Sequence, residues 1–276
     1  SDPLSWAQKQ VEIIPELNWK GKYILSEKEM RKYWITQRVE ENTTLRKKFK
    51  NDPQGLKKAE KLLEYKTGRQ FWKSNEICMR HAEGIRSNTP VLAKLWYFWT
   101  NHFTISDTQS LASFSTGAYQ REFIRANMDK KFETMAIEAT IAWPMMMHLD
   151  NKDNVGPKSK SAKSEWRRRE KRPATINENH ARELLELHTV SPKAGYTQED
   201  IIELAKIMTG WRPKWTKRKD HGHNVSFDSE RHEPGKKTIF GKVYKRGSKS
   251  LKIVIKDLVN HPSCREFIAT KLCRYL

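Results

Sequence analysis

The chain is short of the residues that define several common classes of protein. Its 276 residues include three cysteines, Cys78, Cys264 and Cys273, with no CxxC pair and no metal-ligand spacing. This odd number argues against a disulfide framework and favours buried thiols over redox chemistry. No apolar run approaches the ~18 residues of a membrane-spanning helix. The sequence therefore supports neither a disulfide-stapled protein nor a membrane-spanning one.

The common catalytic and ligand-binding motifs are missing as well. There is no GxSxG, HExxH or DFG set, no Walker motif, no EF-hand spacing and no internal repeat. Serine and cysteine nucleophiles, nucleotide cradles and repeat arrays therefore lack support. Hydrophobic residues make up 37% of the chain, which is low for a globular protein but too high for a disordered one.

Acidic residues are also in deficit, with 33 Asp and Glu against 53 Lys and Arg and a net charge of +20. Such an excess suggests a polyanionic partner: nucleic acid, an anionic glycan or a membrane surface. One basic cluster contains Lys158, Lys160, Lys163, Trp166, Arg167, Arg168, Arg169, Lys171 and Arg172. A second runs from Arg212 to Lys219. Polyanion binding and solvated surface loops explain these clusters about equally well.

Helical periodicity dominates what is present. It predicts a mainly α fold, a single multi-helix domain with a small β-hairpin insertion around 224–244. We expect residues 1–88 to form an N-terminal helical region and 89–276 a helical core, continuous with each other. Ser26 with Glu29, and more weakly Thr197 with Asp200, have capping-box spacing. Residues 119–127 are expected to form a helix, Cys264 and Cys273 to share another helix, and Gly241 to permit a tight turn between two strand segments. Residues 151–175 are expected to be a polar loop with exposed basic side chains.

The most informative stretch is N-E-N-H-A-R-E-L-L-E-L-H-T, residues 177–189. On a regular helix, Ala181, Leu184, Leu185 and His188 would share one face, and Glu178, Arg182 and Glu186 a second. A histidine on an apolar stripe beside an acid–base–acid row indicates a polar network. That network could be catalytic, or it could be a buried structural one that fixes the helix register.

Several side chains could complete a site with this helix. His180 and Glu183 have the i, i+3 spacing of carboxylate–histidine metal pairs, which leaves room for a divalent metal ion, and His102, His148 or His232 would then supply further ligands. His102 lies on an aromatic helical face, where a lone histidine is more often a core residue. The loop from Asp150 to Pro157 has calcium-type oxygens, but turn roles are favoured. His232–Lys237 reads either as an anion-presenting turn or, more simply, as a hairpin loop.

Seven motifs in order resemble a bacterial family known as domain of unknown function 1800 (DUF1800). They are W-T-N-H-F (99–103), Y-Q-R-E-F-I-R-A-N (119–127), P-M-M-M-H-L-D-N with N-V-G-P (144–157), the 177–189 stretch, G-Y-T-Q-E-D-I-I-E-L-A-K-I-M-T-G-W (195–211), H-E-P-G-K-K-T-I-F-G (232–241) and H-P-S-C-R-E-F-I-A-T-K-L-C-R-Y-L (261–276).

The resemblance implies a fold and candidate residues, and no established reaction. Glu178, Arg182, Glu183, Glu186 and His188 match the family pattern, whereas the family often has an aromatic residue at the position of His180. Many members look exported and are encoded near exported sulfatase-like proteins, which implies an exported or periplasmic location; without that implication, a cytoplasmic location is expected. The family usually continues beyond a K-L-C-R motif, so the resemblance also implies a truncation at Leu276 or an unusually short member.

Three functions remain open at this point. The first is a hydrolase, metal-assisted or otherwise, that acts on an anionic polymer. Its catalytic candidates are Glu183, Glu186, His188, His102 and Arg182, with a glutamate as general base and Arg182 as an anion ligand. The second is a non-catalytic module that binds nucleic acid or anionic glycan through the basic clusters. The third is a structural subunit. The sequence leaves the oligomeric state open.

Overall fold

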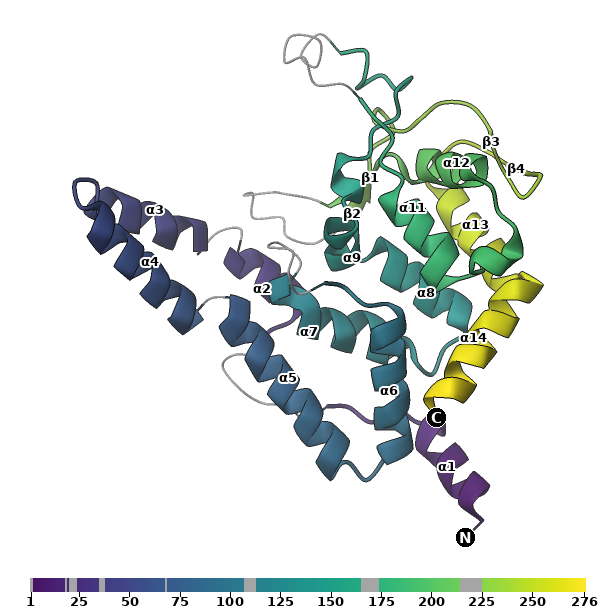
Figure 1. Ribbon diagram of the computed structural model, residues 1–276, viewed down its shortest axis with the longest axis horizontal. Helices are drawn as coiled ribbons and strands as arrows, with labels where there is room; N and C mark the ends of the chain where they lie inside the picture. The colour runs from purple at the N-terminus through teal and green to yellow at the C-terminus, as the bar shows by residue number, and fades with distance from the viewer. Residues whose placement is uncertain are drawn as a thin grey trace. The chain divides into compact units, whose positions relative to one another are not determined.

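The computed structural model describes residues 2–17, 19, 24–34, 38–67, 69–106, 113–164, 174–213 and 225–276. These residues fall into two compact units (Figure 1). Unit 1 holds residues up to Thr100 and Thr104–Asp129, and unit 2 holds Asn101–Phe103, 130–213 and 225–276. The predicted fold class, mainly α with a small β-hairpin, is confirmed. The predicted division at residue 88 rests on motif positions and stays a prediction.

Unit 1 is helical throughout. Its α-helices are α1 (Pro3–Glu12), α2 (Glu27–Lys32), α3 (Arg38–Lys48), α4 (Pro53–Thr67), α5 (Arg69–Arg86), α6 (Pro90–His102, whose last two residues belong to unit 2) and α7 (Thr116–Tyr119). The capping box predicted at Ser26 and Glu29 is present at the start of α2. The helix expected over 119–127 instead continues from α7 as a π-helical turn, Gln120–Ile124, and a 3-10 turn, Arg125–Asn127.

Unit 2 is built from α8 (Phe132–Ile141), α9 (Trp143–His148), α11 (Asn179–Glu183), α12 (Gln198–Met208), α13 (Lys249–Asn260) and α14 (Pro262–Tyr275). Its core is formed by apolar faces of these helices, including Leu184, Leu204 and Val254, each fully buried. Thr197 and Asp200 form the weaker capping box that the sequence predicted for α12. Local signals therefore placed both caps correctly, because a cap depends only on residues three positions apart.

The strands form two small antiparallel sheets. β1 (Trp211–Pro213) pairs with β2 (Val225–Phe227), and β3 (Lys237–Ile239) pairs with β4 (Lys242–Tyr244). The β3–β4 turn has positive φ at both Phe240 (49°) and Gly241 (73°), as a two-residue hairpin turn requires. The tight turn predicted at Gly241 is confirmed, whereas the sequence did not identify β1.

The loop after α9 is irregular, as predicted for the described part of 151–175, apart from a 3-10 turn at Asn151–Asp153. Its backbone is nevertheless firmly held: Gly156 N–H donates to Arg231 O at 3.0 Å and Ser161 N–H to Glu230 O at 2.8 Å. A Cβ on Gly156 would lie 2.6 Å from backbone atoms of Glu233, so only glycine fits there. Irregular backbone is therefore compatible with a fixed position.

The cysteine expectation needs correction. All three thiols are free, but Cys78 and Cys273 are exposed and Cys264 alone is buried. Both Cys264 and Cys273 lie on α14, as the sequence predicted. Within the described residues, no helix has the length and hydropathy needed to cross a membrane.

Candidate functional site

The 177–189 stretch is not one regular helix. α11 covers Asn179–Glu183, and a π-helical turn follows at Leu184–His188. The predicted apolar face is confirmed, because Ala181, Leu184, Leu185 and His188 are all buried. A π turn adds one residue to the helical repeat, and such turns are frequent at functional sites. The spacing of 3.6 residues gave no sign of it.

The buried end of this segment meets His102. The His102 Nε2 atom lies 3.1 Å from the His188 carbonyl oxygen, and the Lys271 Nζ atom lies 3.0 Å from His102 Nδ1. A carbonyl oxygen can only accept, so Nε2 carries the proton and Nδ1 accepts from the Lys271 ammonium group. His102 is 3% exposed. Its pKa lies well below the ordinary value because of burial first, then Lys271 and His188.

A cavity of about 400 Å³ opens beside this pair. α14 and the 3-10 turn Pro192–Ala194 form its walls, and Lys271 is one of the lining residues. The lining is basic and rich in hydroxyls: Ser191, Pro192, Lys193, Ser263, Glu266, Phe267, Thr270, Lys271 and Arg274. Three cations against one carboxylate favour an anionic ligand. Burial lowers the pKa of Lys271.

Unit 2 buries a further histidine, His180, in addition to His188. His180 is fully buried, and among the described residues neither of its ring nitrogens has a hydrogen-bond partner; the same holds for His188 Nδ1. Burial, followed by the neighbouring His188 and His148, lowers the pKa of His180 to about 3. Burial, Lys271 and His148 lower the pKa of His188 to about 3. Both rings are therefore neutral at physiological pH.

The acidic row of the segment faces elsewhere. Arg182 pairs with Glu178 at 3.1 Å and also donates to Gln198 Oε1 at 3.1 Å. Burial and the nearby Glu186 raise the pKa of Glu183, while Arg182 lowers it. In the described residues, neither Glu183 nor Glu186 hydrogen-bonds or forms an ion pair with a histidine. The structure thus brings His102 and His188 together and leaves Arg182, Glu183 and Glu186 in a second, half-exposed group.

No metal set forms at either group. Among the residues that the structure describes, no three His, Cys, Asp or Glu side chains are placed to hold a metal ion. The loop considered for calcium uses its amides otherwise: Asn151 Nδ2 donates to Trp211 O at 2.7 Å, and Asn154 Nδ2 to Ala205 O at 2.9 Å. This geometry supports a turn and capping role for Asn151 and Asn154, because their amides donate to carbonyl oxygens at the end of α12 and just beyond it.

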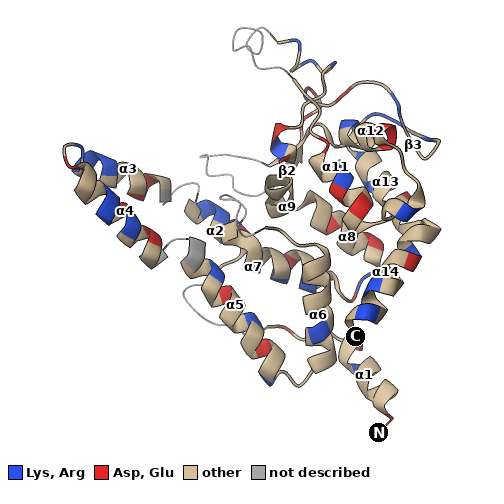
Figure 2. Ribbon diagram, viewed as in Figure 1, with Lys and Arg blue, Asp and Glu red and all other residues tan. Residues whose placement is uncertain are grey.

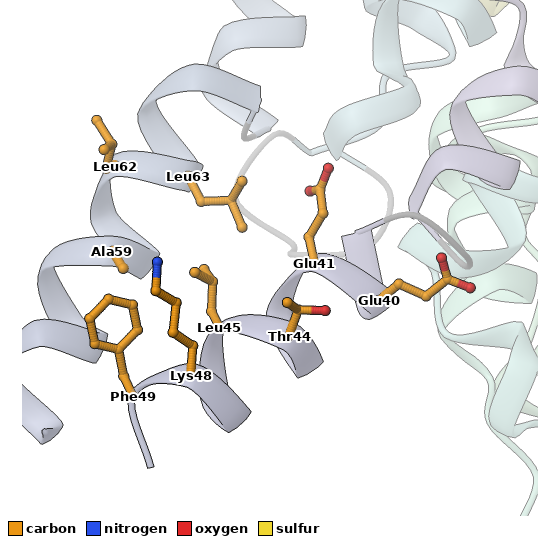
Figure 3. A pocket seen from close by; sticks show the side chains of 9 residues that line it. All are labelled: Glu40, Glu41, Thr44, Leu45, Lys48, Phe49, Ala59, Leu62 and Leu63. Atoms are coloured by element: carbon orange, nitrogen blue, oxygen red, sulfur yellow. The ribbon is translucent and has the colours of Figure 1, made fainter. Parts of the chain in front are cut away.

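A larger cavity, of about 860 Å³, lies in unit 1 between α3 and α4 (Figure 3). Leucine, phenylalanine and alanine side chains form most of its floor, with Glu40 and Glu41 toward one end and Lys48 toward the other. It contains no histidine or cysteine. This composition suits a protein surface better than a reaction centre.

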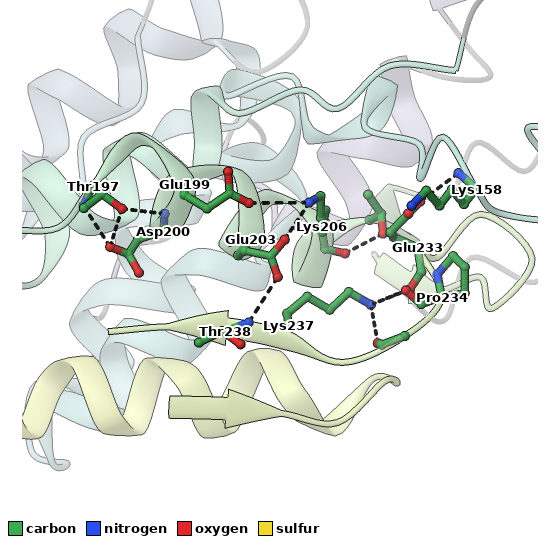
Figure 4. Close-up of polar contacts among 12 residues, drawn as sticks. Lys158, Thr197, Glu199, Asp200, Glu203, Lys206, Glu233, Pro234, Lys237 and Thr238 are labelled. Carbon is green, nitrogen blue, oxygen red and sulfur yellow. Dashed lines mark hydrogen bonds and ion pairs between the residues drawn. The ribbon is translucent and has the colours of Figure 1, made fainter. Parts of the chain in front are cut away.

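In the H-E-P-G-K-K segment, His232, Glu233 and Lys237 are buried, whereas Pro234, Gly235 and Lys236 are exposed. Figure 4 shows contacts of Glu233 and Lys237. Lys237 is 1% exposed and donates to the carbonyl oxygens of Glu233, Pro234 and Gly235. His232 Nδ1 donates to Thr209 O at 2.7 Å, and its Nε2 accepts from Gly247 N–H at 3.2 Å. The geometry supports the simpler hairpin-loop interpretation for His232 and Lys237, because both side chains bond to backbone atoms of the fold, whereas Lys236 is exposed.

The basic cluster is only partly within the described residues. Lys158, Lys160 and Lys163 are exposed, as predicted. The rest of it, Trp166, Arg167, Arg168, Arg169, Lys171 and Arg172, and most of the Arg212–Lys219 cluster lie outside the described residues.

The fold and the site define a mainly α-helical protein with a buried histidine pair beside a cation-lined cavity. A model of the family described as Protein of unknown function (DUF1800) matches residues 20–276, and the chain belongs to that family. No curated protein and no solved structure matches the chain. The resemblance found in the motifs is thus confirmed. Sequence reasoning missed Lys271, which is 169 positions from His102 and has no local signal that links the two.

Proposed function

We propose that unit 2 is an enzyme domain that binds an anionic group of its substrate in the α14 cavity and uses His102 as the acid–base group. One observation carries this proposal: the Lys271–His102–His188 carbonyl chain ends in the wall of a cavity that also contains Lys193 and Arg274. An imidazole whose tautomer is fixed by a backbone acceptor is the usual arrangement of a general base.

Charge explains how binding and chemistry would be linked. In the absence of ligand, Lys271 donates to His102 Nδ1. An anion in the cavity competes for that ammonium group, since a charge-assisted bond to an anion is stronger than one to a neutral imidazole. His102 Nδ1 then becomes free to accept a proton from the substrate or from water. Arg182, Glu183 and Glu186, the other predicted catalytic residues, belong in this proposal to the approach surface of a larger substrate.

The experiment separates binding from chemistry. Sulfate binding is measured by calorimetry, and turnover is measured with the 4-nitrophenyl esters of acetate, phosphate and sulfate. Lys271→Met should weaken sulfate binding about tenfold or more. The matched control Lys252→Met, which replaces an exposed lysine of α13, should not weaken it. His102→Gln should retain binding and lose turnover. Wild-type turnover of all three esters at the level of His102→Gln would reject the catalytic role, and unchanged sulfate binding by Lys271→Met would reject the pocket.

A second candidate function is polyanion binding through the basic cluster. The observation that favours it is the fixed backbone beneath exposed lysines: Lys158 N–H donates to Glu233 Oε2 at 2.9 Å, next to the bonds of Gly156 and Ser161. A held loop presents its charges without a large loss of conformational freedom on binding. Each phosphate or sulfate contact displaces a counterion, so binding should weaken steeply with salt.

Heparin chromatography tests this candidate. The triple substitution of Arg167, Arg168 and Arg169 by serine should lower the eluting salt concentration, as should replacement of Lys158, Lys160 and Lys163. The lysine replacement should not lower thermal stability, because the exposed charges of these three residues contribute little. Elution at the wild-type salt concentration by both variants would show that the cluster is a solvated loop. Lys271→Met serves as the control, since the α14 cavity is a separate site.

A further inference from the structure

The helical hairpin α3–α4 lacks a core of its own. From residue 39 to residue 65 no side chain is buried, although the hairpin contains Leu45, Phe49, Leu56 and Leu63. Leu62 is 53% exposed. Helices of this length draw most of their stability from burying an apolar face. The incompletely buried apolar side chains of α4, together with Leu45 of α3 and Phe49 just after it, are therefore a surface for another helical element.

The open face is the cavity of about 860 Å³ between the two helices (Figure 3). Its apolar members come from the whole hairpin: Leu45 belongs to α3, Phe49 follows the last residue of α3, and Leu62 and Leu63 belong to α4. The spacing of Ala59, Leu62 and Leu63 places them on one side of α4. A groove with such walls accepts a packed helix or helix pair.

The charges on α3 indicate which partner fits. Figure 2 shows acidic residues toward the start of the helix and basic residues toward its end. Glu41 and Lys48 both line the groove and are seven residues apart, about two helical turns. A two-fold axis that passes between Thr44 and Leu45 exchanges these two positions. An antiparallel copy of α3 thus sets opposite charges against each other twice.

We propose that the α3–α4 hairpin is a homodimerisation surface, in which two copies of the chain pair their grooves about a two-fold axis into a four-helix bundle. Glu41 of each copy lies against the second copy's Lys48, and the leucines of both hairpins fill the space between. A self-complementary patch of this kind is what a two-fold interface requires. The proposal concerns unit 1 and stands independently of the proposed function of unit 2.

Sedimentation equilibrium over about two decades of protein concentration tests the proposal. The wild-type protein should show a concentration-dependent dimer. Leu62→Glu should abolish it, whereas Tyr65→Ser, an 81% exposed residue of the same helix outside the groove, should leave it unchanged. Glu41→Lys should raise the dissociation constant about tenfold, since it creates two like-charge contacts.

The charge swap gives the sharpest readout. Glu41→Lys combined with Lys48→Glu should restore dimerisation, because opposite charges again face each other across the axis. The same double variant is unfavourable for the helix dipole at both ends of α3, so a purely local effect would make it worse than the single variant. A wild-type protein that stays monomeric throughout, or a double variant that dimerises no better than Glu41→Lys, would overturn the proposal.

Discussion

Each unit buries polar side chains at a π-helical turn. Unit 1 buries them as a charged pair, whereas unit 2 buries them as neutral rings. In unit 1, Arg121 on the turn Gln120–Ile124 forms two hydrogen bonds to the Glu76 carboxylate, at 2.8 and 3.2 Å, and a third to Leu25 O at 2.7 Å. In unit 2, the turn Leu184–His188 carries His188, which is buried and neutral and leaves Nδ1 without a partner among the described residues. Unit 1 thus pairs its buried charges, whereas unit 2 buries neutral imidazole rings.

Removing one partner from the unit 1 network should give the largest effect. Glu76→Ala leaves the Arg121 guanidinium buried without its carboxylate, so the free energy of unfolding should fall by about 3–5 kcal/mol. Chemical denaturation measures this loss. Glu60→Ala, which removes a solvent-exposed pair with Arg46, is the matched control and should cost under about 0.5 kcal/mol. Equal costs for the two variants would contradict the account of unit 1.

The stability of the two units should depend differently on pH. His180 and His188 have folded pKa values of about 3, below their unfolded value, so the unfolded state binds more protons between these limits. Their contribution to stability is complete above about pH 6.5 and is lost as the pH falls; the two together should cost about 3 kcal/mol by about pH 5.5.

Two buried or half-buried glutamates of unit 1, Glu27 and Glu122, respond to acid with the opposite sign. Burial raises the pKa of Glu27 and of Glu122, so their contribution to stability is complete at low pH and is lost as the pH rises through the folded values. Hydrogen exchange at two pH values should therefore show protection falling first in unit 2. Earlier loss in unit 1 would refute this comparison.

A glycine tests how tightly the unit 1 network is built. A Cβ on Gly117 would lie 2.2 Å from Glu76 Cγ and 2.4 Å from Glu76 Cβ. Gly117→Ala must displace the carboxylate that holds Arg121, and we expect a loss of about 1–3 kcal/mol, measured by thermal unfolding. In the Glu76→Gly background, which removes both the Cγ and the Cβ of residue 76, the same substitution should cost much less. An equal cost in both backgrounds would show that the clash acts on other neighbours.

The smallest effect on stability is expected for a substitution of His180 in unit 2, whose ring nitrogens have no hydrogen-bond partner among the described residues. His180→Phe removes no hydrogen bond within the described residues, so the stability at neutral pH should change by less than about 1 kcal/mol. The acid sensitivity of unit 2 should decrease, because one of its titrating groups is gone. A loss of several kcal/mol at neutral pH would show that His180 has a partner that stabilises the fold.

Much of the fold was predictable, because its signals are local. The caps at Ser26 and Thr197, the turn at Gly241 and the buried face of residues 181–188 all depend on neighbours a few positions apart. The two π turns were not predictable, since the apolar spacing is equally compatible with a regular helix. The site was predicted in part: the His102–His188 contact joins two motifs that were singled out.

Lys271 and the separation of the acidic row from the histidines could not be predicted. Lys271 is one of 53 basic residues, and only tertiary packing of α14 brings it to His102. Long-range pairings of this kind leave no periodic trace in a single sequence.

The central claim is that His102 is a neutral base whose Nδ1 lone pair accepts a hydrogen bond from Lys271. Nitrogen-15 NMR of histidine-labelled protein reads the tautomer and the pKa directly, with His102→Gln to assign the resonances. The account predicts a proton on Nε2, a neutral ring well below pH 6.5, and an Nδ1 resonance that sulfate shifts in the wild type but not in Lys271→Met. A proton on Nδ1, or a titration at the ordinary histidine pKa, would contradict it.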